Sequence, residues 1–353
     1  SDCIVTSGNS PALFRLGSAL ECCDLTQYGI EHELLAQCFM PNIGGIIAVS
    51  YVESQFEFNL ISPSVLDYSV IDGTEPAESM LTVNEYIAED YWSAVNGSSL
   101  PENLQGVRSR ADEISEKYGV RILLSSQCLP ACTFAEYPTT TTDQMDLADE
   151  AASINAALDS LEEALSLYPA GFFPQFRSEF GDGGIRIMLV GGFESNFNMI
   201  GYSVQNSLWH NIYVDIFSEG LVGTYCHEIW HATEDHITSI NYGEFDVVQW
   251  AELNPDGFQY IFDPAESILN EGDYTYFGST KPKDCYFIDG YAKTNEREDR
   301  ARIMEYAMTG FFGSELSEYP HLYAKLRYMS DKIRQYFDTT GWSTPRWEDA
   351  LGE

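Results

Sequence analysis

Basic residues are scarce in this sequence. The 353 residues include 18 Lys and Arg against 55 Asp and Glu, which gives a formal net charge of −37 at pH 7. Because proteins hold nucleic-acid backbones through clusters of Lys and Arg, we expect no nucleic-acid partner. We interpret the acidity as a contribution to solubility rather than as a site for a cationic substrate.

Long hydrophobic runs are also lacking. No apolar stretch reaches the roughly 20 residues that a membrane-spanning helix needs, so we expect no membrane span. The apolar fraction of 44% still allows a sizeable core, and the length allows two domains or one large one. The chain begins at Ser1 rather than Met, so we expect a processed form whose export signal has been removed. A lipid anchor ahead of Ser1 is left open.

Cysteine pairs at zinc-finger spacing are absent as well. The eight cysteines include no C-x-x-C pair, which argues against a structural zinc site among the four in the first 38 residues. An even, clustered set predicts disulfides and an exported protein, outside the cell or at its surface. A disulfide between Cys128 and Cys132 would close a tight loop, and Cys226 is expected in the core or in a disulfide.

Residues 1–100 contain no catalytic motif. Residues 44–52 and 56–61 have the pattern of strands, and residues 81–92 fit a short helix or an edge strand. We therefore predict an accessory segment, partly β, whose role the sequence does not reveal.

From residue 101 onward, helical and strand patterns alternate. We predict strands at 120–124, 185–190, 196–203 and 211–217. We predict helices at 104–118, at 144–168 after the cap Asp143, and at 319–336. The order predicts an α+β domain over residues 101–353.

Only six histidines occur, yet two of them stand four residues apart in the segment Cys226–His231, which reads H-E-x-x-H from His227. On a helix that begins near Ser218, His227 and His231 lie one turn apart on one face, so both imidazoles can reach one metal ion. Glu228 projects beside that position, where its carboxylate can take a proton from a metal-bound water.

A catalytic zinc ion takes three protein ligands. The metzincin pattern would require a histidine at position 237 and a glycine at position 234, where this chain has Ile237 and Glu234. That class is therefore excluded, and His236 is expected at the surface or behind the ligands. A carboxylate from a later segment is the other route, and the candidates are Glu252, Glu266, Glu271, Glu296, Glu298 and Asp299.

Helical geometry narrows the choice. In a helix capped by Asn295, Glu298 and the small Ala301 share one face, which would let this helix approach the metal helix closely. Glu296 lies about 200° away from Glu298 around the helix, so only one of the two can face the metal.

The segment 291–301 resembles the E-D-x-A helix of gluzincin-type zinc metallopeptidases, which include exported bacterial proteins and the catalytic domain of anthrax lethal factor. The resemblance implies Glu298 as the third ligand and Tyr291 as a hydroxyl that stabilises the oxyanion. It also implies a zincin-like fold: a mixed twisted sheet, an active-site helix and a helical C-terminal subdomain. The long insertion between His231 and Tyr291 departs from that pattern, and Arg302 replaces an acidic residue of lethal factor.

These features together predict a zinc-dependent peptidase that acts on peptides or proteins, with Glu228 as general base. Glu234 or Asp235 is expected to orient a ligand imidazole. One alternative is a non-catalytic cell-surface binding module that keeps a zincin scaffold, and another is a zinc hydrolase acting on a non-peptide amide. Metal binding alone would not need Glu228, which favours catalysis.

Overall fold

The computed structural model describes the chain in two compact units, Ser1–Ser99 and Leu100–Glu353. The described residues are 2–7, 10–15, 34–40, 45–52, 55–61, 100–128, 137–177, 183–194, 199–206, 209–241, 245, 247–264 and 274–352. The boundary that we placed between residues 100 and 101 lies one residue from this division.

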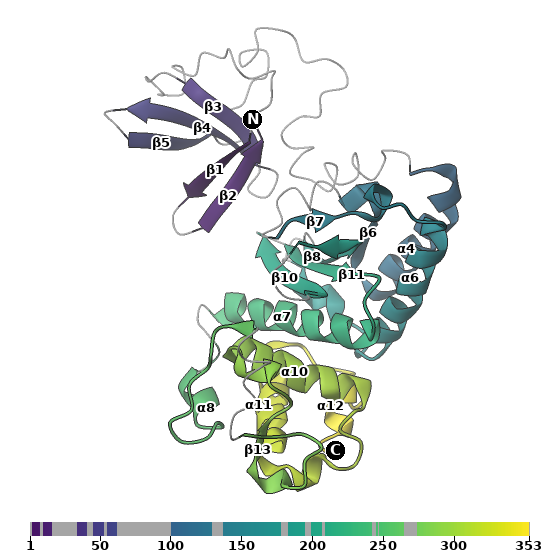
Figure 1. Ribbon diagram of the computed structural model, residues 1–353, viewed down its shortest axis with the longest axis vertical. Helices are drawn as coiled ribbons and strands as arrows, with labels where there is room; N and C mark the ends of the chain where they lie inside the picture. Colours follow the sequence, from purple (N-terminus) through teal and green to yellow (C-terminus); the bar gives the residue numbers. More distant parts are fainter. Residues whose placement is uncertain are drawn as a thin grey trace. The chain divides into compact units, whose positions relative to one another are not determined.

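The described part of the first unit is made of antiparallel strands (Figure 1). Its strands are β1 (Asp2–Ser7), β2 (Ser10–Arg15), β3 (Leu34–Met40), β4 (Gly45–Val52) and β5 (Gln55–Ile61). β1 pairs with β2, and β3, β4 and β5 form a three-stranded sheet. The predicted strands at 44–52 and 56–61 are confirmed, whereas the element predicted at 81–92 lies outside the described residues.

The second unit contains both helices and strands. Its helices are α4 (Gln105–Tyr118), α6 (Glu150–Ser166), α7 (Leu221–Asn241), α8 (Val247–Ala251), α10 (Glu296–Thr309), α11 (Pro320–Tyr336) and α12 (Arg346–Asp349). Its strands are β6 (Arg121–Leu124), β7 (Thr139–Thr140), β8 (Gly184–Val190), β9 (Gly192–Phe193), β10 (Gly201–Asn206), β11 (Trp209–Asp215), β12 (Thr275–Tyr276) and β13 (Cys285–Phe287).

The main sheet of this unit has the order β10-β11-β8-β6. β6, β8 and β11 run parallel, and β10 pairs with β11 in the antiparallel sense at one edge. Ile122, Ile187 and Ile212 are in register across three strands and belong to the buried core. Since residues in register share one face of a sheet, this apolar row is the face that the core covers. The α+β class with a mixed sheet is confirmed.

α7 lies between the two halves of the second unit. Figure 1 shows the sheet with α4 and α6 on one side of α7, and α10, α11 and α12 on the other. α7 contacts α6, β10 and β11 in the first half and α10 and α11 in the second. The side chains of α7 can therefore meet those of both the edge strand and the C-terminal helices.

Three predicted element boundaries were wrong. α6 begins at Glu150 rather than at 144, because the Asp149 carboxylate accepts a hydrogen bond from the Ala152 amide and caps the helix there. The third strand lies at Gly201–Asn206 rather than at 196–203. α7 begins after Gly220, which has a left-handed φ of 73°, and not directly after Ser218.

The predictions on membrane spans and cysteines are tested only within the described residues. None of the described helices combines the length and the apolar composition that crossing a membrane requires. Cys226 and Cys285 are buried thiols outside any disulfide, so Cys226 belongs to the core. Cys132 lies outside the described residues, as do Cys22 and Cys23.

Candidate metal centre

α7 presents both histidines of the H-E-x-x-H segment on one face. The His227 and His231 side chains are largely buried, and their Nε2 atoms are 3.2 Å apart. Two nitrogens this close can donate lone pairs to a single cation, as the four-residue spacing predicted.

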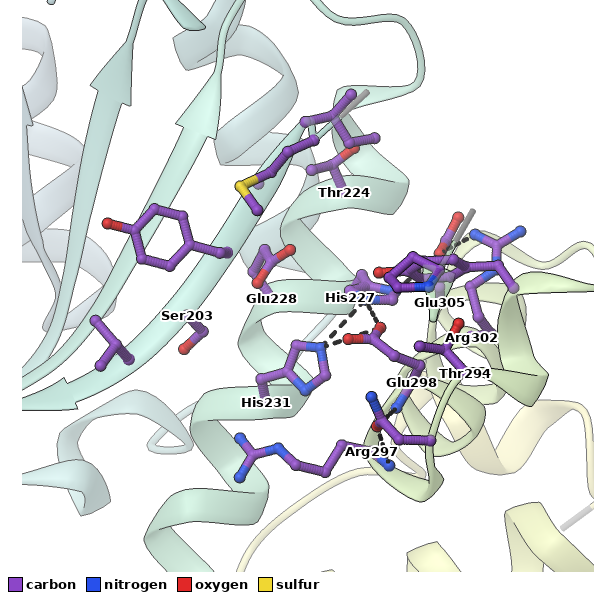
Figure 2. Close-up of a pocket in the computed structure, with 18 of the residues that line it drawn as sticks. Ser203, Thr224, His227, Glu228, His231, Thr294, Arg297, Glu298, Arg302 and Glu305 are labelled. Carbon is purple, nitrogen blue, oxygen red and sulfur yellow. Dashed lines mark hydrogen bonds and ion pairs between the residues drawn. The ribbon is translucent and has the colours of Figure 1, made fainter. Parts of the chain in front are cut away.

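Glu298, in the first turn of α10, completes the group. Its Oε2 lies 3.0 Å from His227 Nε2 and 3.5 Å from His231 Nε2. Figure 2 shows the three side chains converging between the two helices. Asn295 caps α10 through its Oδ1, which accepts hydrogen bonds from the amides of Arg297 and Glu298 and so fixes the start of the helix. The three residues form a group whose donor atoms all lie within 4.8 Å of one another.

The other candidate carboxylates do not join this group. Glu252 is exposed and Glu296 is half-buried. Asp299 is buried and accepts hydrogen bonds from Lys325 Nζ at 2.6 Å and from the Tyr260 hydroxyl at 2.9 Å. Glu266 and Glu271 lie outside the described residues.

Glu305 is a further carboxylate at the site, which the sequence analysis did not identify. Its Oε2 lies 3.3 Å from Nδ1 of His227, on the side of the ring away from Glu298. Arg302 forms ion pairs with Glu305 and with Asp289, the latter at 2.5 Å. A carboxylate on the distal ring nitrogen fixes the orientation of a ligand imidazole.

Close approach of the two helices makes this contact possible. A Cβ atom on Gly223 of α7 would meet Glu305 Oε1 at 3.0 Å. Ala301 of α10 is completely buried in the core, as expected for a small residue between packed helices.

The prediction that Glu234 or Asp235 orients a ligand imidazole was wrong. Glu234 accepts two hydrogen bonds from the Arg300 guanidinium, at 2.9 and 2.5 Å. Asp235 pairs with Arg297 Nη1 at 2.7 Å. Arginines on the facing helix therefore bind both carboxylates, and within the described residues Nδ1 of His231 has no hydrogen-bond partner.

Glu228 lies beside the metal-binding group, on the side of the sheet edge (Figure 2). Its carboxylate is buried, and within the described part of the chain its Oε2 has no hydrogen-bond partner. A Cβ atom on Gly201 of β10 would meet Glu228 Oε1 at 3.0 Å, so the edge strand approaches this carboxylate closely. Burial raises the pKa of Glu228 above its ordinary value.

Tyr291 lies in the short 3-10 helix Tyr291–Lys293 that precedes α10. The centroid of its ring is 6.3 Å from that of His227. Burial and the neighbouring Glu298 carboxylate raise the pKa of Tyr291 well above its usual value, so the phenol keeps its proton at neutral pH. The phenol is therefore a hydrogen-bond donor close to the ligand group.

The charges at the site compensate one another. Burial alone would lower the pKa of His227, but Glu298 and Glu305 raise it to about 10. Burial alone would raise the pKa of Glu298, yet His231 and His227 hold it well below the ordinary value. The carboxylates thus hold a positive charge where the three donor atoms meet, and a bound metal ion would replace the proton there.

A cavity of about 1050 Å³ opens in front of these groups. The three ligand residues, Glu228 and Tyr291 line it, together with residues 201–205 of β10. The cavity is large enough for several residues of an extended peptide.

The prediction that His236 lies at the surface or behind the metal ligands was wrong. Its ring is mostly buried, 4.7 Å from that of Phe176 and 5.7 Å from that of His210. Burial lowers the pKa of His236 to about 4 and that of His210 to about 3. Both imidazoles are therefore neutral members of an aromatic cluster.

Comparison of the chain with protein-family models, with curated proteins and with solved structures finds no match.

Proposed function

We propose that His227, His231 and Glu298 hold a zinc ion and that the chain is a zinc-dependent peptidase of the gluzincin type. The observation that carries this proposal is the convergence of two imidazole nitrogens and one carboxylate oxygen, 3.0 to 3.5 Å apart, from two helices. Two histidines and a glutamate form the ligand set of several catalytic zinc sites. The same ligand types also occur in non-haem Fe(II) sites, so the metal must be identified by analysis.

Zinc held there would act as a Lewis acid and lower the pKa of a bound water toward about 7. Glu228 is the base in this proposal. Its Oε2 has no partner within the described residues, and its raised pKa suits a group that takes a proton from water and then gives it to the leaving amine.

Tyr291 and the edge strand supply the contacts to the substrate. The Tyr291 hydroxyl would donate a hydrogen bond to the oxyanion that forms as the carbonyl is attacked. Within the described residues, β10 pairs only with β11, and its residues 201–205 line the cavity. An extended peptide can add to such an edge through main-chain hydrogen bonds.

Cleavage assays with the zinc-loaded 353-residue chain test this proposal. The substrates are casein and a mixture of synthetic peptides, and mass spectrometry identifies the products. Glu228→Gln should keep zinc and lose at least about 100-fold in rate, as expected when a general base is removed. Tyr291→Phe should also keep zinc and slow turnover.

The outcomes separate the alternatives. Zinc binding without any cleavage would favour a non-catalytic binding module, and hydrolysis restricted to small amides would favour a hydrolase of another class. Cleavage by Glu228→Gln at the wild-type rate would show that the proposed base is wrong. Export from the cell and the accessory role of residues 1–100 remain predictions from the sequence.

A further inference from the structure

Phe262 combines two unusual properties. Its side chain is 72% exposed, the largest value among the exposed large hydrophobic residues that the structure describes. Its φ of 58° lies in the left-handed region, which within the described residues only one other non-glycine residue, Ser125, adopts. A bulky residue in this conformation is strained, and such strain persists only where the surroundings impose it.

Backbone hydrogen bonds tie Phe262 to the segment that leads into α10. The Phe262 amide donates to the Thr294 carbonyl at 2.8 Å, and the Ile261 amide donates to the Lys293 carbonyl at 3.0 Å. Thr294 directly precedes Asn295, the residue that caps the helix of the third ligand. The position of Phe262 is therefore coupled to that of Glu298.

The side chain of Tyr260 fixes the same segment a second time. Its hydroxyl donates to Asp299 Oδ2 at 2.9 Å and accepts hydrogen bonds from Trp250 Nε1 and Asn254 Nδ2. Asp299 is in turn buried against Lys325. With both Tyr260 and the Phe262 amide anchored on the α10 side, the backbone between them has little freedom to relax the strain.

The exposed ring lines the cavity of the metal centre. Phe262 and Pro264 belong to the wall of this cavity, as do Met199 and Ile200, which precede β10. The Ile200 side chain is 42% exposed. Apolar surface is thus available on two separate segments of a cavity whose floor carries the charged ligand residues.

We propose that Phe262 determines substrate specificity by receiving a large apolar side chain of the bound peptide. This inference rests on the proposed peptidase function and names the chemistry that the cavity selects. An apolar side chain covering the ring would remove both from water, which is favourable, and aromatic rings add specific contacts to that burial. The segment 258–264 lies in the long stretch between His231 and Tyr291, where the sequence departs from the gluzincin pattern. The proposed contact of Phe262 with substrate is therefore not taken from the resemblance to that family.

The first test measures folding stability. Glycine adopts a left-handed φ without steric cost, and the largely exposed Phe262 ring makes only a distant edge contact with the Tyr260 ring, 6.5 Å between centroids, among the described residues. Phe262→Gly should therefore unfold at the same or a higher temperature than the wild type. A fall of several degrees would assign the ring to the folded core and overturn the proposal.

The second test measures peptide binding without catalysis. The zinc-loaded Glu228→Gln chain is immobilised, a mixture of synthetic decapeptides is passed over it, and mass spectrometry identifies the retained peptides. Peptides with Phe, Leu or Met should be enriched about tenfold over those with Ala, Ser or Asp. Adding Phe262→Ala should abolish this enrichment, whereas adding Phe311→Ala should preserve it, because Phe311 is 67% exposed and lies outside the cavity.

Equal enrichment with and without Phe262, or no enrichment at all, would overturn the proposal. The failure of the peptidase function is a different result: the wild-type chain would cleave no peptide although retention still depended on Phe262.

Discussion

At the scale of single residues, Glu305 shows how a ligand histidine is held in place. Its contact with His227 Nδ1 leaves Nε2 directed at Glu298, and Arg302 keeps the carboxylate charged. Glu305 follows Glu298 by seven residues, which is two turns on the same helical face. That spacing was visible in the sequence and could have identified it.

Replacing Glu305 tests this role. Glu305→Gln should weaken zinc affinity by about 10- to 100-fold, the range found when carboxylates that support ligand histidines are lost. Competition with a chromophoric chelator measures the affinity. Glu318→Gln, at an exposed position, serves as the matched control and should leave the affinity unchanged.

Burial of His236 beside His210 predicts that the folded state loses stability in acid. His236 has a folded-state pKa of about 4, below the ordinary value of 6.5, so the unfolded chain binds the proton first as pH falls. The folded state therefore loses stability from about pH 6.5 downward. Between pH 7 and pH 5 this one group should cost about 2 kcal/mol.

His236→Phe removes the titrating imidazole while keeping an aromatic ring beside Phe176. Urea unfolding at pH 7 and pH 5 should show a loss of stability smaller by about 2 kcal/mol in the variant. An identical pH dependence in both proteins would mean that His236 is accessible to protons in the folded state.

The sequence was most informative for the residues that lie within one helix. The spacing of His227 and His231 alone placed both nitrogens correctly. Glu298 lies 67 residues further along the chain. It was chosen because it shares a helical face with the small Ala301 and because its segment resembles a known motif. The roles predicted for Glu234 and Asp235 were wrong because arginines of α10 bind both carboxylates. An ion pair between two helices leaves no regular spacing in the sequence from which it could be predicted.

At the scale of elements, the site depends on how closely β10 and α10 approach α7. Glycines stand at both contacts: Gly201 faces Glu228, and Gly223 faces Glu305. Helical periodicity predicted α4 and α11 to within a few residues, because each carries a regular apolar face, whereas α7 was located by the H-E-x-x-H spacing. The position of β10 was missed by several residues, since an edge strand with one partner shows a weaker pattern.

A methyl group at Gly201 should disturb the base selectively. Gly201→Ala places a Cβ 3.0 Å from Glu228 Oε1 and 3.1 Å from the Tyr213 carbonyl, so Glu228 must move. Turnover should fall by about tenfold or more, because displacement of a catalytic group is costly, while zinc content stays unchanged.

Gly106→Ala is the control for that experiment. A Cβ at Gly106 meets nothing within 4 Å, and this residue lies in α4 away from the site. The variant should keep full activity and gain slightly in stability, since alanine favours helices. Equal turnover in Gly201→Ala and wild type would place Glu228 outside the catalytic step.

At the scale of the whole second unit, the proposed metal joins its two halves. α7 packs against the sheet and α6, and α10 belongs to the C-terminal helices (Figure 1). A ligand that binds only the folded state stabilises it by mass action, by about 2.7 kcal/mol at 100 times its dissociation constant. Zinc should therefore raise the unfolding temperature, and a chelator should reverse the gain in wild type but not in His231→Ala.

Metal analysis of the purified 353-residue chain tests the central claim most directly. After equilibration with zinc and removal of the excess, mass spectrometry of the elements should find one zinc per wild-type chain. It should find far less in Glu298→Ala, while the exposed control Glu252→Ala keeps the full amount. Absence of zinc from the wild type, or an equal amount in Glu298→Ala, would contradict a metal held by His227, His231 and Glu298.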